Sequence, residues 1–225
     1  MDGLRYNQGL YRLFENLRRI QPEIYIEACR GGGQSLDLGM VARANGAWLS
    51  DHTTVPSVTR YCQTGALRWL PPDYVNMAVT SRDGSPRQHL HPGRLLSRMV
   101  GTLSFNGDIA AWSPAEATAV RSWVDVFKQI RDQRGPRARL PLGQPRWVED
   151  WDAAAFLGGE SEDLLYIFRD LGPARREIAS LGQDDFSVGG DWEIVLADEG
   201  VTIDQRAGKC TLELPQWGGA LLRRS

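Results

Sequence analysis

The sequence predicts an α/β unit with a parallel sheet, followed by an all-β unit with antiparallel strands. In the first part of the chain, short apolar runs alternate with segments whose apolar residues recur every three or four positions, an order typical of right-handed βαβ units. In about the last 80 residues, apolar and polar residues alternate between turn signals, which indicates half-buried strands. We assign residues 1–135 to the first unit and 136–225 to the second.

Composition narrows the class of protein. The chain has 225 residues with 26 basic and 28 acidic side chains, a balance that argues against nucleic-acid binding through phosphate neutralisation. No apolar run approaches the ~18 residues of a membrane span, and no signal peptide is evident, so we expect a soluble, cytoplasmic protein that binds no membrane. Three cysteines, odd in number and far apart, do not resemble a disulfide framework or a zinc cluster. Eight tryptophans suit apolar packing or the faces of sugars.

The first unit begins with a helix that ends before Pro22. Its apolar face is formed by Leu10, Leu13, Phe14, Leu17 and Ile20. A strand is expected over 23–29, because β-branched and aromatic residues are frequent there. Three glycines at 31–33 make a turn, and a short helix follows around Met40.

Two more strand and helix pairs follow. Strands are expected over 47–51 and 75–79, and the apolar faces of their helices lie within 55–69 and 95–103. Each of these strands would be buried on both faces of a parallel sheet. Next, Ser113, Pro114 and Glu116 form a capping box with proline at the first helical position, and this helix extends to Ile130. The arginine-containing stretch 131–139 is interpreted as a solvated linker.

The second unit is predicted as a small antiparallel sandwich. Its expected strands cover 163–168, 174–180, 192–196, 201–205 and 209–214. The alternation is clearest around Trp192 and Cys210.

Candidate site residues lie where parallel strands end, because ligands bind at the carboxyl ends of such strands. The first strand leads into C-R-G-G-G-Q at 29–34. Three glycines could hold a phosphate, but the spacing is neither G-x-G-x-x-G nor G-x-x-x-x-G-K-[ST], so a nucleotide site is disfavoured. A tight turn is the simpler interpretation, and glycine also lets the backbone approach a ligand closely.

The second strand leads into W-L-S-D-H-T at 48–53. Asp51 is a candidate general acid, whose partial burial would raise its pKa. Equally, Asp51 or Thr53 could cap the following helix. No G-x-S-x-G nucleophile elbow is present. Asp37 is expected to cap or brace the short helix.

The third strand leads into Asp83, His89 and His91. A metal site there lacks a third ligand at suitable spacing, so loop polarity or substrate contact is favoured.

Together these segments resemble glycoside hydrolase family 36, the melibiase-like α-galactosidases. The resemblance is carried by E-A-C at 27–29, the glycine turn, D-L-G-M at 37–40 and W-L-S-D-H-T at 48–53, which come in the family's order and nearly its spacing. Leu70-Pro71-Pro72 matches the proline-containing segment before the last barrel strand. A closing helix and a C-terminal β-sandwich also match, so the resemblance covers essentially the whole chain.

The resemblance implies the last three strands and helices of a (β/α)₈ barrel followed by the sandwich. It also implies hydrolysis of terminal α-galactosides with retention of configuration through two carboxylates, without a metal or organic cofactor. Asp51 takes the place of the family's acid/base. Cys29, Gly32 and Gly33 would line the galactose subsite, and Trp48 would pack behind Asp51 or against the sugar.

Two departures limit this expectation. Ser35 stands where the family usually has arginine, and Gln34 could replace one of its hydrogen bonds. The family's nucleophile belongs to a K-x-D motif, yet the chain contains no K-x-D, and its only lysines are Lys128 and Lys209. We therefore expect part of a larger enzyme, inactive alone, with an upstream half-barrel chain or a second copy as partner. The alternatives are a non-catalytic carbohydrate-binding protein, a subunit that completes a partner's barrel and, more remotely, a nucleotide-binding protein.

Overall fold

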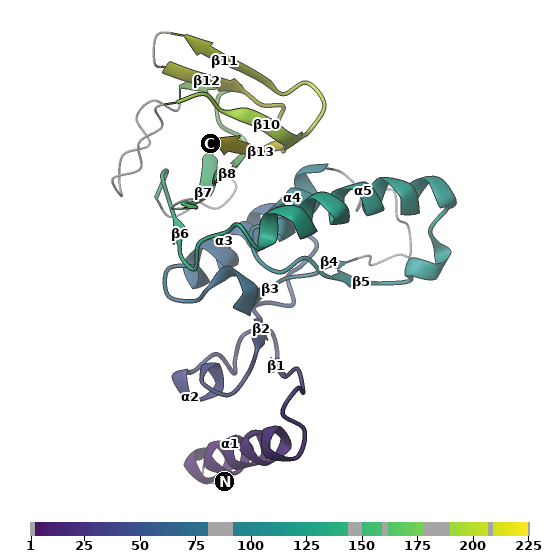
Figure 1. Cartoon of the computed structure of the whole chain (residues 1–225), viewed down its shortest axis with the longest axis vertical. Coiled ribbons are helices and arrows are strands. Elements are labelled where there is room, and N and C mark those ends of the chain that lie inside the picture. The colour runs from purple at the N-terminus through teal and green to yellow at the C-terminus, as the bar shows by residue number, and fades with distance from the viewer. Residues whose placement is uncertain are drawn as a thin grey trace.

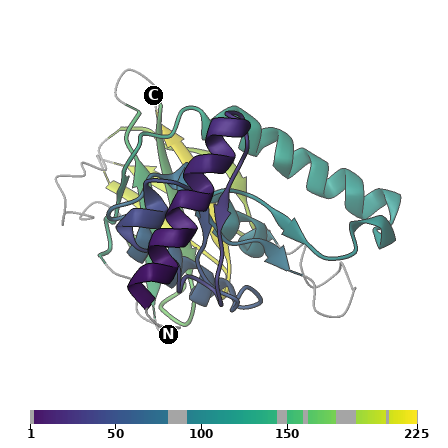
Figure 2. The ribbon, with the colours of Figure 1, turned by 90° about the horizontal axis from the view of Figure 1, so that it is seen from below.

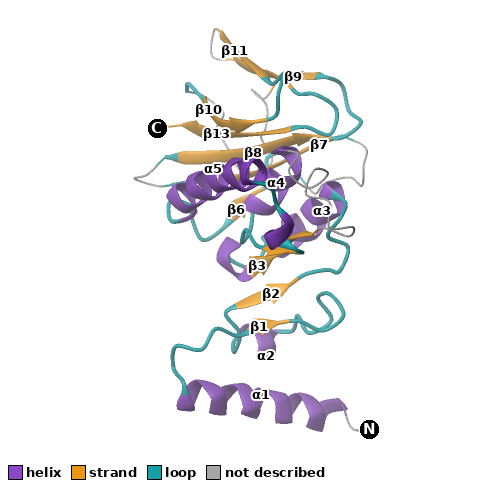
Figure 3. Ribbon diagram, turned by 90° about the vertical axis from the view of Figure 1, so that its right-hand side faces the viewer, coloured by secondary structure: helices purple, strands orange, loops and turns teal. Residues whose placement is uncertain are grey.

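The computed structural model describes residues 3–80, 92–143, 150–158, 162–177, 190–206 and 209–224. Figure 3 shows these residues arranged in successive layers. The N-terminal helix lies at one end, followed by a small parallel sheet, a layer of helices and the two sheets of the β unit. The predicted order of an α/β unit followed by an antiparallel β unit is confirmed.

The parallel sheet contains β1 (Glu27–Ala28), β2 (Gly46–Trp48) and β3 (Val75–Asn76), in that spatial order. All neighbours are parallel, as predicted. The paired strands are shorter than predicted, because only two or three residues of each run form the ladder. A second parallel pair, β4 (Val79–Thr80) with β5 (Phe105–Asn106), was not predicted.

In the part of the chain that the structure describes, five α-helices accompany these strands: α1 (Gly3–Ile20), α2 (Leu38–Val41), α3 (Pro56–Ala66), α4 (Pro92–Met99) and α5 (Pro114–Arg131). Short 3₁₀ helices, η1 (Pro72–Tyr74) and η3 (Ile109–Ala111), precede β3 and α5. The predicted capping box is confirmed, since the Ser113 hydroxyl accepts from the Glu116 amide and the Glu116 carboxylate accepts from the Ser113 amide. Helix α4 ends before the predicted position, where Gly101 approaches the Val75 carbonyl too closely for a side chain.

Helix α1 lies across the end of the molecule (Figures 1 and 2) and contains no buried residue. Its predicted apolar stripe is therefore only partly covered, and Leu13 and Ile20 are more than half exposed. Leu10 and Phe14 pack against the edge of the core, and polar contacts add to this: the Tyr11 hydroxyl donates to the Asp37 carboxylate over 2.6 Å, and Glu15 pairs with Arg43.

The β unit is a sandwich of two antiparallel sheets. Its strands are β6 (Ala138–Arg139), β7 (Trp151–Phe156), β8 (Asp163–Arg169), β9 (Arg175–Glu177), β10 (Glu193–Ala197), β11 (Thr202–Arg206), β12 (Lys209–Glu213) and β13 (Gly219–Arg224). One sheet has the order β10-β13-β8-β7-β6 and the other β11-β12-β9. The five predicted strands correspond to β8–β12, although 178–180 lie outside the described residues. Strands β6, β7 and β13 were not predicted.

The interpretation of 131–139 as a solvated linker is wrong in two respects. Strand β6 forms within it, and Arg134 is buried. The Arg134 guanidinium donates to the carbonyls of Met99, Val100 and Gly101 at the end of α4 and pairs with Asp73. Because the last carbonyls of a helix have no partner within the helix, an arginine there satisfies them from inside the protein.

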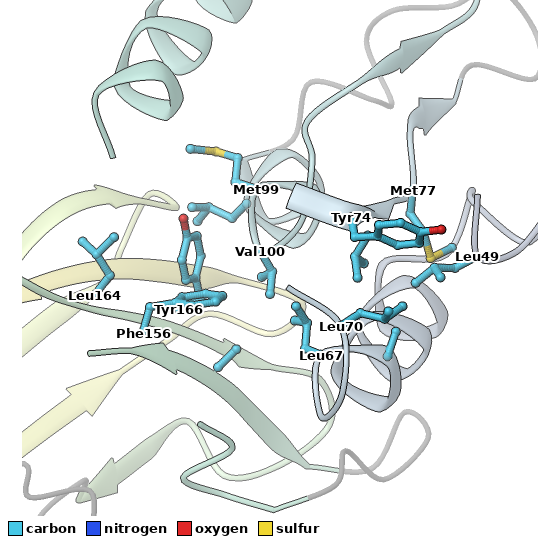
Figure 4. Close-up of a cluster of buried hydrophobic side chains, with 14 of the residues drawn as sticks. Leu49, Leu67, Leu70, Tyr74, Met77, Met99, Val100, Phe156, Leu164 and Tyr166 are labelled. Carbon is cyan, nitrogen blue, oxygen red and sulfur yellow. The ribbon is translucent and has the colours of Figure 1, made fainter. Parts of the chain in front are cut away.

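One hydrophobic core joins the parallel sheet to the sandwich. Figure 4 shows it continuing from Leu49 and Met77 past Met99 and Val100 to Tyr166. Helices α3 and α4 lie between the parallel sheet and the sandwich and contact each other, and α4 also contacts β13. Among the described residues, no helix is both long and apolar enough to cross a membrane.

Candidate functional site

The site lies where β1 and β2 end. These strands are parallel neighbours, with Glu27 opposite Gly46 and Ala28 opposite Ala47. The segments that follow them therefore leave the sheet at the same edge. As a result, two predicted motifs that are separated by about one helix in the sequence come together in space.

The glycine turn lies directly against the segment after β2. Gly32 and Gly33 have φ angles of +63° and +81°, in the region that disfavours other residues. A Cβ on Gly32 would lie 2.5 Å from the Asp51 amide nitrogen, and one on Gly33 would lie 2.5 Å from the Leu49 carbonyl oxygen. Both the backbone conformation and the close approach require glycine at these two positions. This geometry explains the glycines without a phosphate.

The Asp51 side chain is held by the strand that delivers it. The Trp48 indole Nε1 donates to the Asp51 Oδ1 over 3.0 Å, and the His52 amide donates to the Ser50 hydroxyl over 3.1 Å. Trp48 is half-buried, whereas Asp51 is exposed. The expected partial burial of Asp51 is wrong: its backbone lies against the glycine turn, but the residue is exposed.

The capping alternative for this loop is also wrong. Helix α3 begins at Pro56, and its N-cap residue is Val55, which makes no side-chain capping bond. Thr53 is buried and lies before the helix starts. Asp37, by contrast, caps α2 as predicted, since its carboxylate accepts from the Met40 amide over 3.0 Å. Asp51 is therefore not needed to begin a helix.

A polar network that the sequence interpretation did not include crosses the same sheet. The Asn76 amide donates to the Glu27 Oε1 over 2.5 Å, and the Ser104 hydroxyl donates to the Asn76 Oδ1 over 2.6 Å. Asn76 is the register partner of Trp48, so both side chains lie on one face of the sheet. The available signal was a polar residue between apolar neighbours in each strand: Glu27 after Ile26, and Asn76 between Val75 and Met77.

The remaining candidates occupy different positions. Cys29 is an exposed free thiol at the end of β1. The Gln34 side chain lies beside Gly31: a Cβ added to Gly31 would lie 3.0 Å from the Gln34 Nε2 atom. Asp83, His89 and His91 lie outside the described residues. Within the described ranges, no group of three or more His, Cys, Asp or Glu side chains could hold a metal ion.

A hollow of about 550 Å³ lies behind the glycine turn. Its lining is mostly apolar and comes from the turn, Leu36, Leu49, Tyr61 and Cys62 of α3, and Trp69 just after that helix. Burial raises the pKa of the Cys62 thiol, although a hydrogen bond with Ser50 acts in the opposite direction.

Comparison with known proteins adds an independent finding. The family model described as Melibiase matches residues 2–134. Alpha-galactosidase AgaA of Geobacillus stearothermophilus is 27% identical over 204 residues, which cover 84% of this chain and 26% of AgaA. Alpha-galactosidase 2 of Pediococcus pentosaceus is 27% identical over 129 residues, which cover 56% of this chain and 18% of that protein.

Solved structures show the same fold over nearly the whole chain. The α-galactosidase AgaB of G. stearothermophilus superposes with a TM-score of 0.68 at 22% identity, covering 96% of this chain and 31% of AgaB. A variant of AgaA in complex with raffinose gives a TM-score of 0.67 at 20% identity, with the same coverage. The chain thus spans between about a fifth and a third of the length of these relatives.

Proposed function

The chain belongs to the melibiase family, and from this premise we propose that it is the C-terminal part of a retaining α-galactosidase. Residues 1–135 are the last three strands and helices of a (β/α)₈ barrel, and residues 136–225 are the adjoining β domain. The substrate is a terminal α-galactoside. Asp51 is the general acid/base, and Cys29, Gly32, Gly33 and Trp48 form part of the sugar pocket.

The observation that carries this proposal is the contact between the two strand ends. The backbone at Gly32 touches that of Asp51, while Trp48 holds the Asp51 carboxylate and leaves it exposed. A general acid must reach the glycosidic oxygen from a fixed position. The rigid turn and the indole bond supply that position. The glycine turn also leaves its backbone free of side chains where a sugar hydroxyl would approach.

Asp51 needs a second carboxylate to complete the reaction. In a retaining mechanism the two carboxyl groups are ~5–5.5 Å apart: one attacks the anomeric carbon, while the other first protonates the leaving group and then deprotonates water. Asp73, another carboxylate of the parallel-sheet unit, is unsuited to this role, because it precedes β3 at the opposite edge of the sheet and pairs with Arg134. We propose that the nucleophile comes from a barrel segment outside these 225 residues.

A steady-state assay with 4-nitrophenyl α-galactoside tests this function. The chain is assayed alone and in combination with the polypeptide encoded immediately upstream of it. We expect no turnover from the chain alone and clear turnover from the combination. Asp51→Asn should lower kcat of the combination by about 100-fold or more, within the range of general acid–base catalysis.

The matched control is Asp73→Asn, which removes a carboxylate at the other edge of the same sheet and should leave kcat unchanged. Wild-type turnover by Asp51→Asn would refute the acid/base role. If Asp73→Asn loses activity while its fold stays intact, Asp73 is required for the reaction, and the proposal has given the acid/base role to the wrong carboxylate.

One observation favours a second candidate, a subunit that completes a partner's barrel. Helix α1 has no buried residue, and Leu4, Leu13 and Ile20 are each more than half exposed. An apolar helix face of this kind usually packs against another element. Co-purification of the chain with the separately expressed upstream polypeptide would support this candidate, and failure to associate would count against it.

A further inference from the structure

Arg98 is a buried arginine on α4 that contacts the loop carrying Asp51. Its relative exposure is 2%, and it is the largest of the fully buried side chains in the described residues. The Nη1 group donates to the Arg94 carbonyl over 3.1 Å, one turn back in its own helix. The Nη2 group donates to the Thr53 carbonyl, which belongs to the loop between β2 and α3. This second bond links α4 to the backbone two residues after Asp51.

This position is electrostatically unfavourable for an arginine. Burial lowers the pKa of Arg98 to about 9, and the nearby positive charges of Arg60 and Arg94 act in the same direction. Within the described residues, the buried Nε has no hydrogen-bond partner. Arg60 at the same helix layer is different, because Asp152 and Asp170 neutralise it. An apolar side chain would fill the place of Arg98 without this cost.

The hydrogen bond to Thr53 gives Arg98 a role that an apolar side chain of the same size could not fill: it holds the loop that carries Asp51. The residues between β2 and α3 form no helix or strand, and Asp51 and His52 are exposed. Thr53 is where this loop returns to the interior, since its exposure is only 3%. The Trp48 indole thus holds the Asp51 carboxylate itself, and Arg98 holds the loop backbone two residues further on, at Thr53.

We propose that Arg98 is a positioning residue for Asp51, acting through the hydrogen bond from its guanidinium to the Thr53 carbonyl. The inference rests on the proposed function of Asp51. When the bond is present, the loop keeps the carboxylate on the Trp48 indole. When it is lost, the loop moves and the carboxylate leaves that position. Catalytic geometry is sensitive to displacements of this size, because a shift of ~1 Å can cost about 100-fold in rate.

The experiment reads the position of Asp51 without requiring turnover. The full chain is labelled with 5-fluorotryptophan, and Trp48→Phe identifies the ¹⁹F resonance of Trp48. Because the indole donates to the Asp51 carboxylate, this resonance should shift as the carboxylate is protonated, and Asp51→Asn should abolish the shift. Arg98→Met should then remove at least half of the shift. Arg98→Lys, which retains a donor toward Thr53, should restore most of it.

Arg94→Met is the matched control, since it removes a charge from the same helix and leaves the donor to Thr53 in place. An unchanged Trp48 resonance in folded Arg98→Met would overturn the proposal, as would an equal change in Arg94→Met. Should Arg98→Met not fold, Arg98→Lys decides in its place: a native Trp48 resonance supports the proposal. A resonance equal to that of Asp51→Asn in a folded Arg98→Lys chain overturns it.

A kinetic measurement separates this inference from the proposed function. When the chain is combined with the upstream-encoded polypeptide, Arg98→Met should lower kcat about tenfold with KM unchanged, as expected when only the transition state is affected. If Asp51→Asn abolishes turnover while Arg98→Met changes neither kcat nor the Trp48 resonance, the positioning role fails alone. If Arg98→Met alters the resonance but Asp51→Asn retains turnover, the loop is positioned by Arg98 and the acid/base role fails.

Discussion

Paired strands are two or three residues long in the parallel sheet, whereas β7, β8 and β13 of the sandwich extend over six or seven. These three strands are also mostly buried, and each is paired with a neighbour on both sides. In the parallel sheet, one face has Glu27, Trp48 and Asn76 on it, and Glu27 is exposed. The larger apolar area removed from water therefore belongs to the sandwich.

This difference indicates that the sandwich supplies most of the stability, whereas the candidate site lies in the less buried parallel-sheet unit. The site is held by polar bonds, close backbone contacts and glycine conformations rather than by a large apolar core of its own. The sandwich supplies a continuous core, and α3 and α4 connect that core to the site loops. A change at the junction should consequently affect the whole chain, whereas a change within the site should act mainly on local geometry.

The largest effect is expected at the junction, where Arg60 of α3 bonds to Asp152 of β7 and Asp170 at the end of β8. The shortest distances are 2.8 and 2.6 Å. Burial opposes the charge of Arg60, but the two carboxylates outweigh it and raise its pKa. Arg60→Ala would leave both carboxylates buried and unpaired, so we expect a loss of about 3–5 kcal/mol in the free energy of unfolding, measured by urea denaturation.

Arg223→Ala is the control for this measurement. Arg223 pairs with Glu162 and Glu193 at the surface of the sandwich, and such exposed pairs contribute ~1 kcal/mol or less. If the two substitutions cost the same, the buried pairs do not couple the units. A separate, earlier unfolding transition in Arg60→Ala would show in addition that the parallel sheet unfolds before the sandwich.

An intermediate effect is expected from glycine substitutions, one in each unit. Gly32 and Gly200 both have positive φ angles, +63° and +84°. A Cβ on Gly200 would meet no atom within 4 Å, whereas one on Gly32 would meet the Asp51 backbone. Gly200→Ala should cost only the backbone strain, about 1–2 kcal/mol. Gly32→Ala should cost about 1–3 kcal/mol more, as overpacking does.

The comparison of these two variants isolates the contact between the strand ends. Urea denaturation gives the two losses, and the ¹⁹F resonance of Trp48 shows whether the loop has moved. Equal losses with an unchanged Trp48 resonance would mean that the close approach is not a constraint, which would remove the main support for the sugar pocket.

Features encoded by neighbouring residues were predictable from the sequence. The capping box depends on Ser113 and Glu116, three residues apart, and the cap of α2 depends on Asp37. The meeting of residues 29–34 with 48–53 was also predictable, because parallel strands place their carboxyl ends at one edge. Each of these inferences uses only local patterns and one rule about sheets.

Features that depend on distant partners were not predictable. Strand β7 contains three consecutive alanines and is buried on both faces, so it shows no period of two. Arg134 belongs to an arginine-containing stretch that is typical of a solvated surface, yet the carbonyls it binds lie at the end of α4 and just after it, more than 30 residues earlier. The bond between Glu27 and Asn76 likewise joins residues 49 positions apart. Burial of a polar residue is decided by such partners, which composition and periodicity do not contain.

The smallest effect, a pH dependence of stability, would sharpen the contrast between Arg98 and the neutralised Arg60. Burial lowers the pKa of Arg98 from its ordinary value to about 9 in the folded protein. At about pH 8 the side chain is protonated in both states, and its buried charge is unfavourable. Above about pH 9 the folded protein releases this proton while the unfolded chain, whose arginine has its ordinary higher pKa, keeps it, so the free energy of unfolding rises with pH.

The rise should amount to about 1.4 kcal/mol between about pH 8 and pH 10, the value of one pKa unit. It is measured as the difference between wild type and Arg98→Met in urea denaturation at each pH, which cancels the titration of other groups. Arg60→Met should show no such difference over this range, because its carboxylate partners raise its pKa. A pH-independent difference for Arg98→Met would mean that Arg98 bears its charge without penalty. The contrast between the two arginines would then be lost.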